Sequence, residues 1–220
     1  MKTIVVMPAF NEEKTIKEAI SRVKKYFDNI VVVDDGSRDK TYVRARESAP
    51  DVPVLRHKIN LGKGAALKTG CEAALKLGAD AIALVDADLQ HLPEDVAVMA
   101  EKLEKENLDI VFGVRAMNEK MPPLARWGNK MLTRMINFLS DISLSDTQSG
   151  LKVFRASIYP KIMWRATDYS VETEIMLATG KEKLKYSESP IQTIYQNAYK
   201  GMNIFDGIKY FLNFLKQKFL

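Results

Sequence analysis

Three oxygen-bearing side chains, Asp86, Asp88 and Gln90, alternate along the stretch that follows the apolar residues 83–85. Side chains at alternate positions of an extended segment point the same way, so this spacing can aim three ligands at one point. Carboxylate and amide oxygens suit Mg²⁺ or Mn²⁺, which commonly keep phosphate or water as further ligands. The pattern therefore predicts a divalent metal site, with a solvated turn as the alternative.

Two further motifs place polar residues beside glycines. In DDGS, the carboxylates of Asp34 and Asp35 can accept hydrogen bonds from a nucleobase or ribose, or can form a turn. In NLGKGAALKTG, Gly62 and Gly64 flank Lys63 just before a helical pattern. Glycines permit close backbone approach and a helix N-terminus attracts phosphate. The spacing matches neither a Walker A loop nor G-x-G-x-x-G, so an ordinary helix start is the alternative.

Charged residues at further positions are weaker candidates. Arg115 follows an apolar run and Arg126 lies early in a helical pattern, where both are candidates to clamp a diphosphate. Asp146 stands in the stretch SDTQSG, which can equally be a plain turn. Glu172 and Glu174 fall in the first turn of a predicted helix, where acids are favoured by the helix dipole in any case.

The elements that must position these residues follow from the apolar pattern. Short apolar runs alternate with helical patterns, which is typical of an α/β fold with a mostly parallel sheet covered on both faces. Ligands of such sheets bind beyond the carboxyl ends of the strands, where the polar clusters fall. Asn11 is expected to cap the first helix. Strands are expected at 3–7, 30–35, 52–57, 81–86, 109–115 and 150–155, helices at 64–77, 93–104, 122–140 and 171–180, and an extended segment at 184–195.

The composition excludes several classes of protein. The 220 residues are 46% hydrophobic, enough for a sizeable core, and the net charge of +5 suits anionic partners without choosing among them. Cys71 is the only cysteine, so the chain has no intramolecular disulfide and no His/Cys zinc cluster. No run approaches the ~20 apolar residues of a membrane span. We expect a reducing, cytoplasmic setting.

The motifs together, in this order, are far more specific than any one of them. VVMPAFNEEKTI, VVVDDGSRDKT, NLGKGAALKTG, LVDADLQHLPED, GVR and DTQSGLKVFR resemble the family 2 nucleotide-sugar glycosyltransferases, which have the GT-A fold. The D-A-D-L-Q-H form looks most like the dolichol-phosphate mannose synthase branch, the polyprenyl-phosphate glycosyltransferases. The resemblance covers about residues 1–180.

The resemblance implies a role for each motif. Asp88 and Gln90 would hold Mg²⁺ or Mn²⁺ on the donor diphosphate, with Asp86 on the nucleotide side of the site. Arg115 and Arg126 would contact phosphates and, with Asp88, act directly in catalysis. The nucleotide pocket would be lined by Pro8, Phe10, Asn11, Glu12, Asp34, Asp35, Lys63 and Asp86, and the acceptor side by Asp146, Glu172 and Glu174.

The same resemblance implies one GT-A domain over residues 1–200, with a nucleotide-sugar half at 1–115 and an acceptor half at 116–200. Residues 201–220 form an expected amphipathic helix whose apolar face and lysines suit a membrane interface. The protein is therefore expected on the cytoplasmic face of the membrane, in peripheral contact with it.

The expected reaction moves mannose or glucose, with inversion, from a GDP- or UDP-sugar to dolichyl or polyprenyl phosphate. A phosphate monoester, with a second pKa of ~6, is ionised at neutral pH and needs no general base. The alternative is a soluble family 2 enzyme that transfers to a hydroxyl in polysaccharide or glycolipid synthesis. Glu172 and Glu174 lie roughly where such relatives carry a base, although the Q-x-x-R-W motif is absent.

Three other classes fit the sequence less well. A sugar nucleotidyltransferase would have a Gly-rich fingerprint where PAFNEE stands. A non-catalytic nucleotide-binding protein would have no need of a metal-binding D-A-D-L-Q. A nucleic-acid binder is opposed by the acidic clusters and by the lack of any recognised motif, so no nucleic-acid partner is expected.

Overall fold

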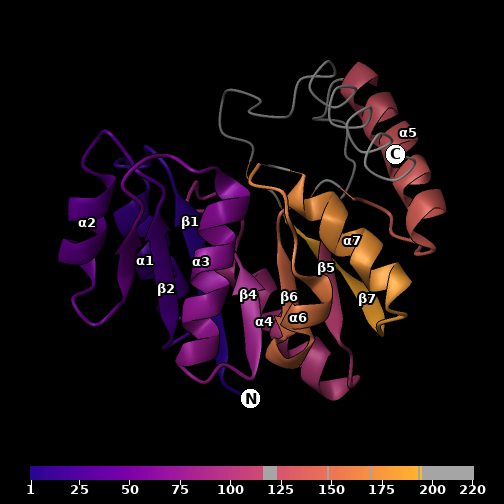
Figure 1. Cartoon of the computed structure of the whole chain (residues 1–220), viewed down its shortest axis with the longest axis horizontal. Coiled ribbons are helices and arrows are strands. Elements are labelled where there is room, and N and C mark those ends of the chain that lie inside the picture. The colour runs from indigo at the N-terminus through magenta and orange to yellow at the C-terminus, as the bar shows by residue number, and fades with distance from the viewer. Residues whose placement is uncertain (116–122, 148, 169, 193, 195–220) are drawn as a thin grey trace.

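A single seven-stranded sheet runs through the structure, a computed structural model that describes residues 1–115, 123–147, 149–168, 170–192 and 194, with the backbone alone at 123–130. The strand order is β3-β2-β1-β4-β6-β5-β7. Neighbouring strands are parallel except at β6, which runs antiparallel to both β4 and β5. The expected mostly parallel sheet is confirmed (Figure 1).

The helices and strands lie close to the positions expected from the sequence. The strands are β1 (Thr3–Ala9), β2 (Ile30–Asp34), β3 (Val54–Arg56), β4 (Ala81–Leu84), β5 (Ile110–Arg115), β6 (Lys152–Arg155) and β7 (Tyr186–Ile191). The helices are α1 (Ile16–Val23), α2 (Thr41–Ser48), α3 (Lys63–Lys76), α4 (Pro93–Lys105), α5 (Pro123–Ser140), the short η1 (Ala156–Ile158), α6 (Tyr159–Ile162) and α7 (Val171–Lys181).

Helices cover both faces of the sheet, and the strands show why. Successive side chains of a strand point to opposite faces, so Ile4 and Val6 of β1 pack with α3, α6 and α7, whereas Val5 and Met7 pack with α1, α2 and α4. Figure 1 shows α3 and α7 in front of the sheet and α2 at its left end. Burial on both faces explains the near-continuous apolar runs of the parallel strands.

The first helix starts later than expected. It begins at Ile16, so the prediction that Asn11 caps it is wrong. Asn11 instead has a φ of 56°, a left-handed conformation that Asn tolerates in turns, and its Oδ1 accepts a hydrogen bond from the backbone N–H of Arg38 at 3.0 Å. Asn11 therefore joins the loop after β1 to the loop after β2.

The antiparallel β6 was not expected and has a consequence for the site. Loops that follow parallel strands leave the sheet at one edge, and the segment that precedes an antiparallel strand enters the sheet at that same edge. The turn before β6, which contains Asp146, therefore lies beside the loops after β4 and β5. The short helices η1 and α6 then return the chain to the face covered by α3 and α7.

The helix α5 stands apart from the sheet at the upper right of Figure 1. Its last residue, Ser140, lies against Gly180 of α7, where the backbones approach too closely for a side chain. Within the described residues, none of the helices combines the length and apolarity needed to cross a membrane. The expected helix at 201–220 lies outside the described residues, and the division into halves at residue 115 stays a prediction.

Candidate active site

The loop after β1 is tied to the loop after β2 along its length. The backbone N–H of Asn11 donates to Ser37 Oγ at 2.9 Å, and that of Glu12 donates to Thr41 Oγ1 at 2.8 Å. Pro8 is buried within β1, whereas the ring of Phe10 is 42% exposed. Of the predicted nucleotide-pocket residues in this loop, Phe10 thus presents an open aromatic face at the carboxyl edge of the sheet.

The two acids after β2 are buried and hold loops of the protein itself. Asp35 accepts hydrogen bonds from His57 Nδ1 at 2.7 Å and from the backbone N–H groups of Leu61 and Gly62 at 2.9 and 2.8 Å. Asp34 accepts from the N–H of Ser37, and its Oδ2 lies 3.0 Å from Arg56 Nε.

These contacts favour the turn interpretation of DDGS over a direct role of both carboxylates in nucleotide binding. Asp35 in particular fixes the segment that leads into α3, since it satisfies consecutive N–H groups there. The assignment of Asp34 and Asp35 to the nucleotide pocket stays a prediction.

The glycines at the start of α3 are explained by a close approach of the second half of the chain. A Cβ at Gly62 or Gly64 would collide with the carbonyl oxygens of Thr167 and Ala166. The N–H of Gly64 donates to Thr167 O at 2.8 Å, and Trp164 Nε1 donates to Gly64 O at 2.8 Å. The helix start therefore serves as a packing surface, and this N–H group already has a partner within the chain.

Lys63 joins two carboxylates that are far apart in the sequence. Its Nζ lies 2.9 and 3.0 Å from the two oxygens of Asp86, after β4, and 3.1 Å from Glu172 Oε1, in the first turn of α7. Burial would lower the pKa of Lys63, but the two carboxylates outweigh it and raise that pKa above its ordinary value. Lys63 is therefore a fixed cation at the centre of the site.

The predicted metal loop separates the roles of its two acids. Asp86 faces Lys63, whereas Asp88 Oδ1 accepts the backbone N–H of Gln90 at 3.0 Å across Leu89, which has a φ of 62°. Burial, and then the charge of Asp86, raise the pKa of Asp88. In the described ranges no three His, Cys, Asp or Glu side chains are grouped to hold a metal ion by themselves. The residues there that could hold a metal, Asp88 and Gln90, would leave further positions around it to water or to a bound molecule.

Two residues of the site were missed by the sequence reasoning. His91 lies near Asp86 and Asp88; burial lowers its pKa, and among the described residues its buried Nδ1 has no hydrogen-bond partner. Lys152 of β6 is 1% exposed, its Nζ donates to Ser149 O at 2.8 Å, and burial lowers its pKa to about 8. A lysine inside the apolar run GLKVF was the available signal for the second.

The other predicted residues divide between paired and structural roles. Arg115 forms a bidentate ion pair with the buried Asp146, in which Nε donates to Oδ2 at 2.7 Å and Nη2 donates to Oδ1 at 3.1 Å. Glu174 accepts the backbone N–H groups of Arg165 and Ala166 at 2.6 and 3.2 Å, so it orders the segment that covers α3. Arg126 lies in α5, where its side chain is outside the described part of the chain.

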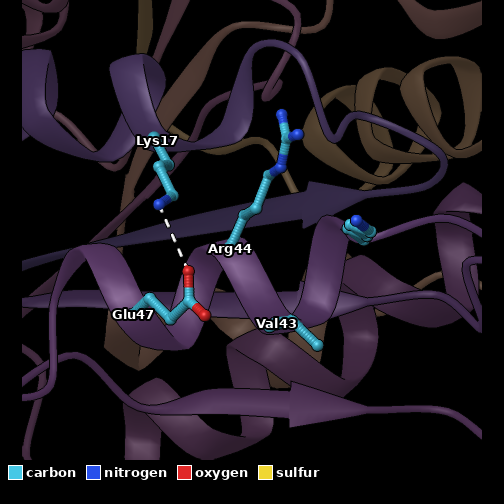
Figure 2. Close-up of a pocket in the computed structure, with 5 residues that line it drawn as sticks. Lys17, Val43, Arg44 and Glu47 are labelled. Atoms are coloured by element: carbon cyan, nitrogen blue, oxygen red, sulfur yellow. Dashed lines mark hydrogen bonds and ion pairs between the residues drawn. The ribbon is translucent and has the colours of Figure 1, made fainter.

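A separate hollow of about 530 Å³ lies between α1 and α2 and is lined by Lys17, Lys40, Val43, Arg44 and Glu47 (Figure 2). Lys17 pairs with Glu47 at 3.3 Å across it. None of the residues that the sequence singled out for chemistry lines this hollow. We therefore assign the site to the carboxyl edge of the sheet, where the charged residues meet.

Known proteins are similar to this chain both in sequence and in fold. It is 38% identical to an uncharacterized protein of Methanocaldococcus jannaschii over 97% of this chain and 91% of the relative. It is 33% identical to a UDP-N-acetylglucosamine–dolichyl-phosphate N-acetylglucosaminyltransferase of Methanococcus voltae over 97% of this chain and 95% of that protein. Other relatives are named as dolichyl-phosphate or polyprenyl-phosphate sugar transferases.

Among solved structures, a glucosyl-3-phosphoglycerate synthase of Mycobacterium tuberculosis, in complex with Mn²⁺, UDP and phosphoglyceric acid, superposes with a TM-score of 0.76. The alignment spans 100% of this chain and 79% of the synthase, at 18% sequence identity. The likeness supports the GT-A fold. The model of glycosyl transferase family 2 matches residues 4–163, which contain β1 to β6 and the metal loop. The chain therefore belongs to glycosyl transferase family 2 and is a glycosyltransferase.

Proposed function

We propose that this enzyme transfers a sugar from a nucleoside diphosphate sugar to a dolichyl or polyprenyl phosphate. The M. voltae relative, matched over nearly its whole length, is named for transfer from UDP-N-acetylglucosamine to dolichyl phosphate. UDP-N-acetylglucosamine is therefore the first donor to test. Mannose and glucose, which the motifs suggested, stay predictions beside it.

The choice of a phosphate acceptor rests on one observation: the carboxylates predicted on the acceptor side already have partners within the protein. Asp146 is held by Arg115, Glu172 by Lys63, and Glu174 by two backbone N–H groups. A sugar hydroxyl needs a base to remove its proton during attack, and a carboxylate held by a cation is a weak base. A phosphate monoester is already ionised, with a second pKa of ~6, so it suits a site built in this way.

The donor site also fits a divalent cation. Asp88 and Gln90 would hold Mg²⁺ or Mn²⁺ together with oxygens of the diphosphate. Burial and then the charge of Asp86 raise the pKa of Asp88, and a cation beside this carboxylate would favour its ionised form. When bound, such an ion neutralises charge that develops on the leaving diphosphate. Phe10 offers a ring for the base.

The lipid acceptor requires contact with a membrane, and α5 offers a surface for it. Met131 and Phe138 are 53% and 84% exposed and lie two helical turns apart on one side of α5, with the exposed Arg134 between them. An apolar face with cations beside it suits a membrane interface. We propose peripheral contact through this face, on the cytoplasmic side.

The proposal is tested by extraction of a labelled lipid product. Purified protein is incubated with Mn²⁺, dolichyl phosphate in detergent, and radiolabelled UDP-N-acetylglucosamine, UDP-glucose or GDP-mannose in turn. We expect label in the organic phase with one donor, abolished by EDTA. Donor turnover with no label in that phase for any of the three would contradict the proposal.

A further inference from the structure

The charged cluster around Lys63 unites three separate elements of the fold. Lys63 opens α3, Asp86 follows β4, and Glu172 lies in the first turn of α7. The side chains of Lys63 and Glu172 are 15% and 14% exposed, and one ammonium group contacts both carboxylates within 3.1 Å. Ion pairs in such partly buried positions are stronger than surface pairs, because water screens them less.

A glycine forms one wall of this cluster. A Cβ at Gly150 would lie 3.0 Å from Asp86 Oδ2, 3.1 Å from Lys63 Nζ and 3.5 Å from Glu172 Oε1. All three charged groups therefore press against the same backbone position, in the turn before β6. The need for glycine here comes from the close approach of these atoms.

The contact with Lys63 engages both oxygens of Asp86. Its two distances to Nζ are 2.9 and 3.0 Å, so the carboxylate already has a cation as its partner on both atoms. Asp88, two residues further along, is turned to the N–H of Gln90 instead. The first acid of the D-A-D motif is thus engaged by a cation of the protein, and the second is the carboxylate proposed above to hold the divalent ion.

We propose that Lys63 is a positioning residue that keeps Asp86 and Glu172 away from a divalent ion, so that the ion binds at Asp88 mainly in company with the donor diphosphate. The inference rests on the proposed function in one respect, that the 86–90 loop is the metal site. Removal of Lys63 takes from Asp86 and Glu172 the cation that contacts both of them, and Asp86 lies two residues from Asp88 in the sequence. Carboxylates left without their cation attract divalent ions without any nucleotide.

The test is a measurement of Mn²⁺ binding in the absence and presence of UDP, by electron paramagnetic resonance of the free ion. The proteins are the wild type, Lys63→Met, Lys63→Arg and the control Lys76→Met, whose side chain is exposed at the far end of α3. We expect Lys63→Met to bind Mn²⁺ without UDP at least tenfold more tightly than the wild type. Lys63→Arg and Lys76→Met should bind it as the wild type does.

A second variant guards against loss of folding in Lys63→Met, since removal of one partner of a buried ion pair is destabilising. Lys63→Met/Glu172→Gln removes one charge of each sign and leaves Asp86 without its cation. It should also bind Mn²⁺ without UDP more tightly than the wild type, although less tightly than Lys63→Met. Circular dichroism checks that each variant is folded.

The outcomes separate this inference from the proposed function. Wild-type protein that binds Mn²⁺ with UDP, while folded Lys63→Met and Lys63→Met/Glu172→Gln bind it without UDP no better than the wild type, overturns the role of Lys63 alone. Wild-type protein that binds no Mn²⁺ even with UDP overturns the metal site, and with it both proposals. A merely structural role for Lys63 would weaken metal binding in the variants.

Discussion

Asp35 after β2 has different partners from Asp146 and Glu172 in the second half of the chain. After β2, Asp35 binds backbone N–H groups and His57, so it shapes a loop. In the second half, Asp146 and Glu172 bind the cationic side chains of Arg115 and Lys63. Acids that lie together at the carboxyl edge of a sheet therefore need not all bind a metal ion or a substrate.

Among the acids of the candidate site, Asp88 is the strongest candidate for a direct role in the reaction. Asp88 is half-buried, and its pKa is raised first by its partial burial and then by the charge of the neighbouring Asp86. A carboxylate with a raised pKa beside a second acid is a candidate functional group, because repulsion between two acids does not stabilise the fold. Four changes sharpen or break this contrast, from the largest expected effect to the smallest.

Replacement of Asp88 should have the largest effect. Asp88→Asn removes the charge that would hold a cation on the diphosphate, so we expect transfer to fall about a thousandfold. The melting temperature should stay the same or rise, because the change relieves repulsion with Asp86. The measurement is product formation at saturating Mn²⁺, together with thermal unfolding. Activity within tenfold of the wild type would show that Asp88 belongs with the structural acids.

Replacement of Asp35 should act on stability. Asp35→Ala leaves the N–H groups of Leu61 and Gly62 and the ring of His57 without their acceptor, at a cost of about 3 kcal/mol. Urea unfolding measures this cost. Asp51→Ala, which removes an exposed partner of Lys24, is the matched control and should cost much less, because water screens exposed ion pairs. Equal costs for the two variants would show that Asp35 does not hold the loop before α3.

Lys152 gives a prediction about pH. Burial lowers its pKa in the folded protein to about 8, below its ordinary value of 10.5, so the unfolded chain binds more protons between these values. This lysine therefore destabilises the fold at neutral pH, and the penalty disappears as the pH rises from about 8 to 10.5.

Lys152→Met should accordingly be more stable than the wild type at pH 7, by about 2 kcal/mol, with the difference shrinking by pH 10. Urea unfolding at several pH values measures it. A difference that stays constant with pH would mean that Lys152 is charged in the folded protein throughout this range.

The smallest effect is expected at Glu174. Glu174→Gln keeps one oxygen acceptor for the N–H groups of Arg165 and Ala166, so stability should fall by about 1 kcal/mol and transfer should stay within twofold. Initial rates with saturating substrates measure the second quantity. A loss of a hundredfold with intact folding would reveal a general base and favour a hydroxyl acceptor.

Much of the fold was predictable from the sequence, because buried parallel strands have continuous apolar runs, whereas helices have apolar residues every three or four positions. The bounds of α4, expected at 93–104 and found at Pro93–Lys105, show how well this works. The antiparallel direction of β6 was not predictable, since a strand four residues long carries no mark of its direction.

The composition of the site was also partly predictable, but its pairings were not. The motifs supplied the candidate residues and the loops that carry them, and their roles stay predictions. Lys63 and Glu172, however, are 109 positions apart, and no local pattern connects them. The glycines beside Lys63 suggested phosphate binding, whereas their contact with Ala166 and Thr167 depends on the packing of the second half of the chain.

The most direct test of the central claim compares two acceptors that differ in one group. Purified protein with Mn²⁺ and its best donor is given either polyprenyl phosphate or the matching polyprenol, which ends in a hydroxyl, and the labelled lipid is counted. We expect product from the phosphate alone, because Asp146, Glu172 and Glu174, the carboxylates predicted to lie on the acceptor side, are held by other groups. Equal product from the polyprenol would contradict it and identify a hydroxyl-accepting enzyme.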